Sequence, residues 1–326
     1  MDGKRVRRSL DLTSWEAAQR RIRDLEIHGE KNLISVEDAC ERWIADCEAR
    51  GLQESTLSKY RARKVELSKV FGKLSVRSVS IEDLRHLREG WKVKASSTGK
   101  RLEIIRNFFA FCIASEWIAQ SPARGIKPPK VRQSPTLPFS AEEWEKILWA
   151  LDAYEELHPN RIRRTALQLK AIVLLMRYSG IRISDVVALK RDKVAKGRLF
   201  LYQAKTGQPV QIPLPKIVLN ALKDCDEGQP FYFWSGVSRV KTAITEWQER
   251  IKKVFEIAGV GTPGARFQSH RLRDTFSVEL LNRGVPLQTV SMLLGHSSVR
   301  TTERHYSPWV KSRQDALEEA IRKTWA

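Results

Sequence analysis

A proline-rich stretch divides this chain of 326 residues. Residues 122–138 hold five prolines, one glycine and no acidic residue, which is typical of an extended linker. Directly after it, Ser140 and Glu143 have the spacing of a capping box, so a helix is predicted to begin there. We therefore expect a short basic segment at residues 1–30, a first domain at 31–126, a linker at 127–138 and a second domain at 139–326.

The two domains differ in their apolar patterns. The first predicts helices, and its clearest helical stripe consists of Leu102, Ile105, Phe108, Phe109, Cys112 and Ile113. In the second, residues 166–178 predict a buried helix, and residues 199–214 predict a β-hairpin whose turn uses Gly207 at positive φ. An amphipathic pattern around Leu317 and Ile321 predicts a C-terminal helix. The expected fold class is mainly α with a small β-sheet, an α+β fold.

An excess of basic residues extends over both domains. Lys and Arg number 58 against 38 acidic residues, a formal net charge of +20. Residues 31–126 carry +6 of it and residues 139–326 carry +10. A folded protein with such an excess usually binds a polyanion, and the longest apolar run, residues 171–176, is too short to cross a bilayer. By itself the charge predicts either nucleic acid or an acidic membrane surface as the partner; double-stranded DNA, and no membrane, is what the family resemblance given below implies.

Two basic clusters in the first domain are candidates for contact with the DNA backbone. They lie within residues 59–73 and 92–106. One such cluster is more often a solvated helix face, but two of them in a positively charged domain favour phosphate contact. The candidate DNA-binding residues are Lys59, Arg61, Arg63, Lys64, Lys100 and Arg106.

Several other classes of site are not indicated. The four cysteines form no Cys-x-x-Cys pair and have no Cys/His ligand spacing, so we expect reduced, buried thiols and no metal site. There is no phosphate-binding loop and no Gly-x-Gly-x-x-Gly, so we expect no cofactor. No apolar segment follows the basic N-terminus, and we expect a cytoplasmic, nucleoid-associated protein.

Four short motifs of the second domain carry candidate chemistry. A helix breaks at Gly180, just before Arg182, and the predicted hairpin turn carries Lys205. A His-x-x-Arg follows, then a Leu-Gly-His and a tyrosine. Taken singly, each of these residues is more often an ordinary structural residue. Together they are candidate catalytic residues, namely Arg182, Lys205, His270, Arg273, His296 and Tyr306, with Asp185 in support one helical turn after Arg182.

In the order and type of these motifs, the chain resembles the tyrosine recombinases, also called the phage integrase family. The resemblance implies a helical core-type DNA-binding domain joined to a mixed catalytic domain. Residues 1–30 would then be the remnant of an arm-binding region. It also implies a site-specific recombinase of a mobile element, acting as a homotetramer on two DNA sites, with an accessory DNA-bending protein as a further partner.

The chemistry suits these residue types. The resemblance implies that Tyr306 attacks a DNA phosphodiester and forms a covalent 3′-phosphotyrosine without metal or ATP. Two guanidinium groups, Arg182 and Arg273, would hold the non-bridging oxygens. Lys205 would protonate the leaving 5′ oxygen with His270 assisting, and His296 would donate a hydrogen bond to the phosphate.

The position of the tyrosine departs from the family pattern by one residue. Members usually place it nine residues after the Leu-Gly-His histidine, and here the separation is ten. Either the intervening loop has an extra residue or His305 takes a neighbouring role. We expect Tyr306 to be the nucleophile because no other tyrosine follows Tyr232.

Two alternative functions stay open. Residues 285–306 also predict a helix-turn-helix, as in a DNA-binding regulator without catalysis. That alternative explains the charge but not the set of Arg182, Lys205 and Arg273. A type IB topoisomerase would share the chemistry and would relax supercoiled DNA without a partner site.

Overall fold

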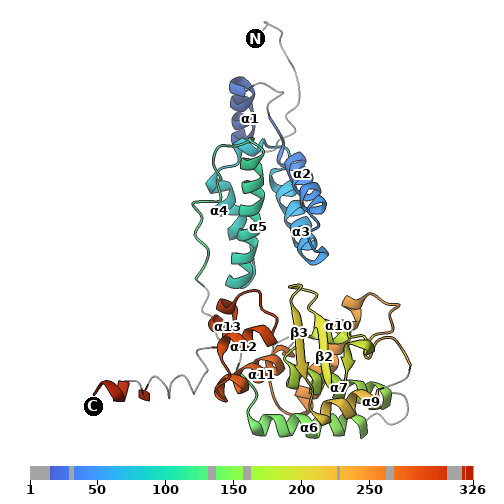
Figure 1. Cartoon of the computed structure of the whole chain (residues 1–326). Coiled ribbons are helices and arrows are strands. Elements are labelled where there is room, and N and C mark those ends of the chain that lie inside the picture. The colour runs from blue at the N-terminus through green and yellow to red at the C-terminus, as the bar shows by residue number, and fades with distance from the viewer. Residues whose placement is uncertain are drawn as a thin grey trace. The chain divides into compact units, whose positions relative to one another are not determined.

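The structure is a computed structural model that describes residues 15–28, 33–130, 137–156, 163–225, 228–261, 268–306, 318–319 and 321–325. It divides into two compact units, residues 1–133 and 134–326, and each is described here by itself. Both are mainly helical, and the second also has a three-stranded sheet (Figure 1). The expected α+β class is confirmed. The division falls within the segment that the sequence predicts as a linker.

Helices form the described part of the first unit. They are α1 (Trp15–His28), α2 (Val36–Ala49), α3 (Glu54–Phe71), a 3-10 turn (Val76–Ser78), α4 (Ile81–Glu89) and α5 (Ala95–Ala114). The core lies among α2, α3 and α5, where Trp43 stacks on Tyr60 with ring centroids 4.7 Å apart and meets the edge of Phe108. Helix α1 is joined to this unit by an ion pair of 2.5 Å between Arg20 and Asp83.

The predicted apolar stripe of α5 is buried, apart from its last member. Ile113 keeps 38% of its surface exposed, because it lies where the helix approaches its end at Ala114. All four cysteines of the chain are buried, as expected. Burial raises the pKa of Cys40 to about 12 and also raises that of Cys112, so neither thiol is a ready nucleophile.

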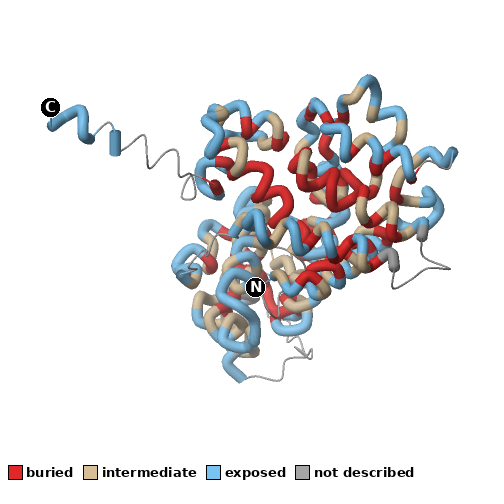
Figure 2. Tube along the Cα trace, turned by 90° about the horizontal axis from the view of Figure 1, so that it is seen from below, coloured by how far each residue is buried: buried red, intermediate tan, exposed pale blue. Residues whose placement is uncertain are grey.

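The second unit is built around one buried helix, α7 (Arg163–Ser179). Its elements are α6 (Ala141–Glu156), α7 (Arg163–Ser179), α8 (Ile183–Val187), a 3-10 turn (Arg191–Lys193), β1 (Val194–Ala195), β2 (Arg198–Tyr202), β3 (Pro209–Pro213), α9 (Lys216–Asp224), α10 (Val240–Ile257), α11 (His270–Asn282), α12 (Leu287–Leu293) and α13 (Val299–Tyr306). Residues 171–176 of α7 are almost completely buried. Helices α6, α9, α10 and α11 pack on this helix (Figure 1), and Figure 2 marks the buried segments of the chain in red. The apolar run of the sequence is thus a core helix.

The predicted hairpin is formed by β2 and β3. The strands pair antiparallel, and their inward-facing residues Leu199, Leu201, Val210 and Ile212 are buried. The turn carries Lys205 in an exposed position, and Gly207 adopts φ +67°, as predicted. Strand β1, which the sequence analysis did not predict, adds two residues to the edge of β2.

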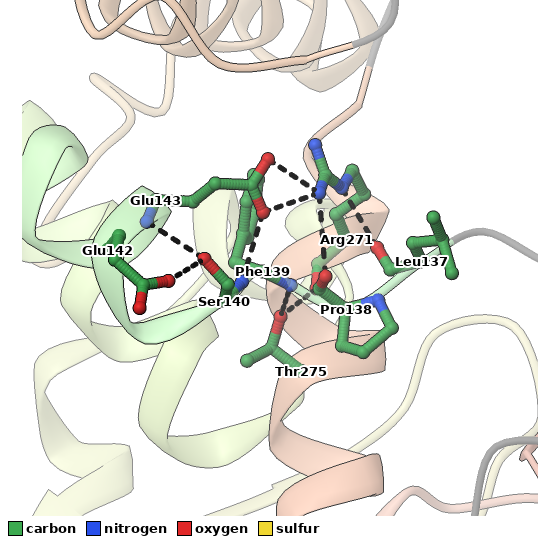
Figure 3. A network of polar contacts seen from close by, with 8 residues as sticks. All are labelled: Leu137, Pro138, Phe139, Ser140, Glu142, Glu143, Arg271 and Thr275. Atoms are coloured by element: carbon green, nitrogen blue, oxygen red, sulfur yellow. Dashed lines mark hydrogen bonds and ion pairs between the residues drawn. The ribbon is translucent and has the colours of Figure 1, made fainter.

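A polar network ties the first described residues of the second unit to α11 (Figure 3). Ser140 and Glu143 form the predicted capping box, with N–O distances of 3.0 and 3.1 Å. The Arg271 guanidinium, whose side chain is 8% exposed, donates to both oxygens of Glu143 and to the Leu137 carbonyl. It also lies 3.9 Å from the centroid of the Phe139 ring. Arg271 therefore holds the start of the unit on α11.

Parts of the sequence predictions lie outside the described residues. These include residues 1–14 and most of the predicted C-terminal helix, of which residues 318–319 and 321–325 are described. Within the described ranges, no helix is both long and apolar enough to span a membrane.

Replacing Arg271 with alanine is expected to destabilise the second unit by about 2 kcal/mol, because it leaves the Glu143 carboxylate and the Leu137 carbonyl without their charged donor. Amide hydrogen exchange should accelerate in α6 and α11. The control is Asp152→Asn, which removes the exposed ion pair with Lys170 and should cost less than about 1 kcal/mol. Equal effects of the two variants would contradict the role assigned to Arg271.

Candidate active site

Two glycines shape the loops that carry Arg182 and His296. Gly180 ends α7 at φ +63°, and a Cβ there would overlap the ring of Phe276. Gly295 has φ +58°, and a Cβ there would lie 2.5 Å from the Gln203 amide. Positive φ and close approach both favour glycine, so each loop passes tightly against the residues behind it.

Arg273 is the buried centre of the site. Its side chain lies on α11 with 1% exposure and donates to the carbonyl oxygens of Gly180 at 2.6 Å and Leu294 at 2.8 Å. It also contacts Nε2 of His296 at 2.9 Å. Burial and the nearby charge of Arg182 lower the pKa of Arg273 to about 10, which still leaves it charged at neutral pH. One guanidinium thus joins α11 to both glycine loops.

Gln203 connects Arg182 to the hairpin and to the second loop. Arg182, at the start of α8, donates from Nη1 to Oε1 of Gln203. The amide nitrogen of Gln203 donates to the Leu294 carbonyl at 2.8 Å, and the Thr206 hydroxyl donates to the same Oε1 at 3.2 Å. Because Gln203 is 1% exposed, these contacts fix the Arg182 head group relative to the turn that carries Lys205.

His296 is held as a neutral ring. A guanidinium can only donate, so Nε2 of His296 accepts from Arg273 and carries no proton. The neutral ring then carries its proton on Nδ1 and donates to the Thr302 hydroxyl at 2.7 Å. Burial, with the charges of Arg273 and Arg182, lowers the pKa of His296 to about 3. Donation from Nε2 to a phosphate would therefore require this nitrogen to gain a proton.

The orientation of helix α13 determines which way Tyr306 faces. Thr302 and Tyr306 lie four residues apart and are both buried, on the face that meets His296, whereas His305 is exposed. The regular helix, with no bulge, directs the tenth residue after His296 inward. The helix-turn-helix pattern of residues 285–306 corresponds to α12 and α13, and the second of these helices ends with its tyrosine in the interior.

The Tyr306 hydroxyl donates to Oδ1 of Asp274 at 2.9 Å. The two side chains are 5% and 6% exposed. Burial and the Asp274 charge raise the pKa of Tyr306 to about 12, and burial raises that of Asp274 to about 6. The predicted nucleophile is therefore a protonated phenol that is hydrogen-bonded to a carboxylate.

The other predicted residues occupy the edge of this group. Asp185 is buried and accepts the Ala204 amide at 3.0 Å, which attaches α8 to the hairpin turn. Lys205 is exposed at that turn. His270 begins α11 with much of its surface exposed. Partial desolvation and the charges of Arg273, Arg182 and Lys205 lower its pKa, so its ring is neutral at pH 7.

The predicted DNA-binding residues differ in their surroundings within the first unit. Three of them form ion pairs with acidic side chains at N–O distances of 2.6 to 3.0 Å, namely Arg61, Arg63 and Lys64. Arg106 donates to the backbone carbonyls of Ala123 and Ile126. Lys59 and Lys100 are exposed and form no ion pair with any residue that the structure describes.

Gln203 and Asp274 are polar residues of the site that the sequence analysis missed. Gln203 has the same parity as the buried Leu199 and Leu201, so strand alternation places it inward, and a polar residue there is a signal. Asp274 gives no such signal, because its contact with Tyr306 depends on the packing of α13 against α11. Among the described residues, no three His, Cys, Asp or Glu side chains are grouped to hold a metal ion.

The His296 ring is expected to stay neutral as the pH falls to about 5, with its proton on Nδ1. Nitrogen chemical shifts of the imidazole measure both properties. Because the folded pKa lies below the unfolded value of about 6.5, the unfolded chain binds the additional proton, and this residue reduces stability as the pH falls below about 6.5. Protonation of the ring near pH 6.5 would contradict the arrangement.

Known proteins resemble the chain over most of its length. Tyrosine recombinase XerD of Pseudomonas putida is 27% identical over 293 residues, which cover 82% of this chain and 91% of that protein. Tyrosine recombinase XerD of Proteus mirabilis is 29% identical over 272 residues, with coverages of 78% and 83%.

Solved structures share the fold. A lambda integrase dimer bound to a COC′ core site superposes with a TM-score of 0.67 at 18% identity, covering 89% of this chain and 85% of that chain. The Tn1549 transposon integrase in complex with a circular intermediate DNA gives a TM-score of 0.64 at 15% identity, covering 85% and 99%.

A family model covers most of the second unit. The model of the phage integrase family matches residues 139–311, more than half of the chain. The match begins at Phe139, within the polar network on α11, and includes every predicted catalytic residue. The chain therefore belongs to the phage integrase family.

Proposed function

We propose that this protein is a site-specific DNA recombinase that cleaves and rejoins DNA through a covalent 3′-phosphotyrosine at Tyr306. The observation that carries the proposal is the convergence of two arginines and an imidazole next to a buried tyrosine. Arg273 contacts His296 at 2.9 Å. Arg182 and Arg273 each interact electrostatically with Tyr306. The family membership supports the same activity.

Arg182 and Arg273 stabilise the negative charge that develops on the non-bridging oxygens of the scissile phosphate. The carbonyl contacts of Arg273 and the Gln203 contact of Arg182 hold these head groups in place before DNA binds. Little reorganisation is then needed when the charge develops, which is how fixed donors lower a barrier. These guanidinium groups supply the stabilisation, and the reaction requires neither metal nor ATP.

Protonation states follow from the same charges. An anionic phosphate next to His296 raises its pKa, because it opposes the effect of the two arginines, and Nε2 can then gain a proton and donate to the phosphate. Lys205, exposed at a hairpin turn that Asp185 and Gln203 anchor, donates a proton to the leaving 5′ oxygen, and His270 assists. Asp185 orients that turn through the Ala204 amide.

Double-stranded DNA is the partner, and the active assembly is a tetramer on two sites. A lambda integrase dimer bound to a core site and a lambda integrase tetramer bound to a Holliday junction support both statements by analogy of fold. In this layout residues 31–126 form a core-type DNA-binding domain, residues 127–138 a linker and residues 139–326 the catalytic domain. An accessory DNA-bending protein and association with the nucleoid stay predictions from the resemblance.

The two alternatives fit less well. A regulator without catalysis leaves unexplained why two cationic side chains are desolvated next to a buried tyrosine, an arrangement that is costly unless it has a use. A topoisomerase would share the site, but the sequence relatives are recombinases by name.

Tyr306→Phe is expected to abolish the covalent adduct with a nicked suicide substrate of the protein's own attachment site, because the nucleophilic oxygen is lost. Denaturing electrophoresis measures the adduct. The matched control is Tyr60→Phe, which keeps the ring stacked on Trp43 and removes only a hydroxyl that accepts from Asn107. Adduct formation by the wild type should be unchanged in EDTA.

Two outcomes would count against the proposal. An adduct that persists unchanged in Tyr306→Phe would contradict the role of this residue. Relaxation by the wild type of a supercoiled plasmid without any attachment site would favour the topoisomerase alternative.

Lys59→Ala and Lys100→Ala are each expected to weaken DNA binding uniformly across sequences and to reduce the salt dependence of binding by about one unit of slope. Both side chains are exposed, so each is available to a phosphate. Arg61→Ala is the comparison, since its guanidinium already pairs with Glu48 and Glu54 and should contribute less. Binding isotherms at several salt concentrations measure the slope. A slope unchanged in both lysine variants would contradict these contacts.

A further inference from the structure

We propose that Asp274 is a catalytic base that takes the proton from the Tyr306 hydroxyl as the tyrosine oxygen attacks phosphorus. This inference rests on the proposed function and adds a residue to its machinery. It answers a question that Lys205, His270 and His296 leave open, namely where the phenol proton goes. Each of these three handles a proton or a hydrogen bond on the phosphate or leaving-group side.

The geometry carries the proposal. The hydroxyl of Tyr306 already donates to Oδ1 of Asp274 at 2.9 Å, the separation across which a proton can pass directly. Asp274 follows Arg273 in α11, so the carboxylate is fixed to the same helical turn as a predicted phosphate-binding arginine. Helix α13 places Tyr306 on the face that packs on α11. The base, the nucleophile and the arginine are thus positioned by two packed helices.

No competing partner satisfies the carboxylate in the described residues. Arg273 directs its guanidinium to Gly180, Leu294 and His296, and Arg271 directs its own to Glu143. These two arginines and Tyr306 are the charged or titratable groups that act on Asp274 from α11 and α13. A carboxylate that is neither ion-paired nor exposed keeps its basicity, as a proton acceptor requires.

The protonation state fits this role. Burial raises the pKa of Asp274 to about 6, so the group is mostly ionised at pH 7 and yet more basic than an ordinary aspartate. The pKa of Tyr306, raised to about 12 by burial and by Asp274, means that free phenolate is scarce. Proton removal must therefore accompany the attack, and a positioned base in contact with the hydroxyl provides it.

The step balances as follows. The O–H bond of Tyr306 breaks and its proton goes to Asp274, while a lone pair of the phenol oxygen forms the bond to phosphorus. The bond from phosphorus to the 5′ oxygen breaks, and that oxygen takes a proton from Lys205. In rejoining, the 5′ hydroxyl returns its proton to Lys205 and attacks phosphorus, and the departing phenol oxygen recovers its proton from Asp274. Neither an oxidant nor a reductant is consumed.

Asp274→Asn tests the proposal, since it keeps the shape and removes the base. Single-turnover cleavage of a suicide substrate at saturating DNA should slow by about 10²- to 10⁴-fold near pH 7.5, with DNA affinity unchanged. The wild-type rate should rise with pH through about 6 or above, because the carboxylate must be ionised, and the variant should lack this rise. Asp152→Asn, an identical change at an exposed ion pair, should cleave at the wild-type rate.

A second substrate separates the base from the acid. When the bridging 5′ oxygen is replaced by sulfur, the leaving group is a thiolate, whose conjugate thiol has a pKa of about 8.5 and which departs without a donated proton. Sulfur should restore cleavage in Lys205→Ala but not in Asp274→Asn. This difference identifies proton removal from the nucleophile, which loss of folding would not reproduce.

Several results would overturn the inference. They are an Asp274→Asn rate equal to or above the wild-type rate, recovery of this variant by sulfur, and a wild-type rate that does not change between about pH 5 and 7. The last measurement needs no variant and decides the matter even where Asp274→Asn fails to fold. Loss of the adduct in Tyr306→Phe together with full cleavage by Asp274→Asn would overturn this inference alone. Persistence of the adduct in Tyr306→Phe would overturn the proposed function as well.

Discussion

The site depends on one buried cation. Arg273 lies inside the second unit with 1% of its surface exposed, and its guanidinium is satisfied by backbone carbonyls of two loops and by a ring nitrogen of His296. A charge removed from water is costly unless each donor finds an acceptor, so the loops at Gly180 and Leu294 must approach α11 closely. The two positive-φ glycines permit this approach. The conformation of these loops and the position of the arginine therefore depend on each other.

Burial and the same cation together set the protonation of its neighbours. Burial, reinforced by the charges of Arg273 and Arg182, keeps His296 and His270 neutral, and the two guanidinium groups favour a nearby anion. Burial acts in the opposite sense on the acidic side, where it keeps Tyr306 protonated and makes Asp274 a stronger base. A bound phosphate would reduce the net positive charge around Arg182 and Arg273 and leave the hydrogen bond between Tyr306 and Asp274 in place. The positive group of Arg273 and the negative group of Asp274 therefore lie within a single turn of α11 and act on different neighbours.

Sequence reasoning predicted the parts that depend on local pattern. The capping box at Ser140, the hairpin around Gly207 and the buried helix at residues 171–176 are all present, because each is specified by residues close in sequence. Contacts between distant segments were not predictable in this way. The spacing of residues in the sequence does not predict the ion pairs of Arg61 with two glutamates. It does not predict the hydrogen bond from Tyr306 to Asp274 either, since both depend on how helices pack. The inward position of Tyr306 could be established only from the orientation of helix α13, which the structure shows.

The two groups that would exchange protons in the proposed reaction differ in their access to water. Lys205 is exposed at a turn, whereas Asp274 is 6% exposed beneath the tyrosine. The lysine is open to proton exchange with the medium, whereas a proton on the shielded aspartate would exchange more slowly. The covalent intermediate would therefore keep the proton needed to regenerate the phenol. Rejoining would need no proton from bulk water on the tyrosine side, so the intermediate is prepared for its own reversal.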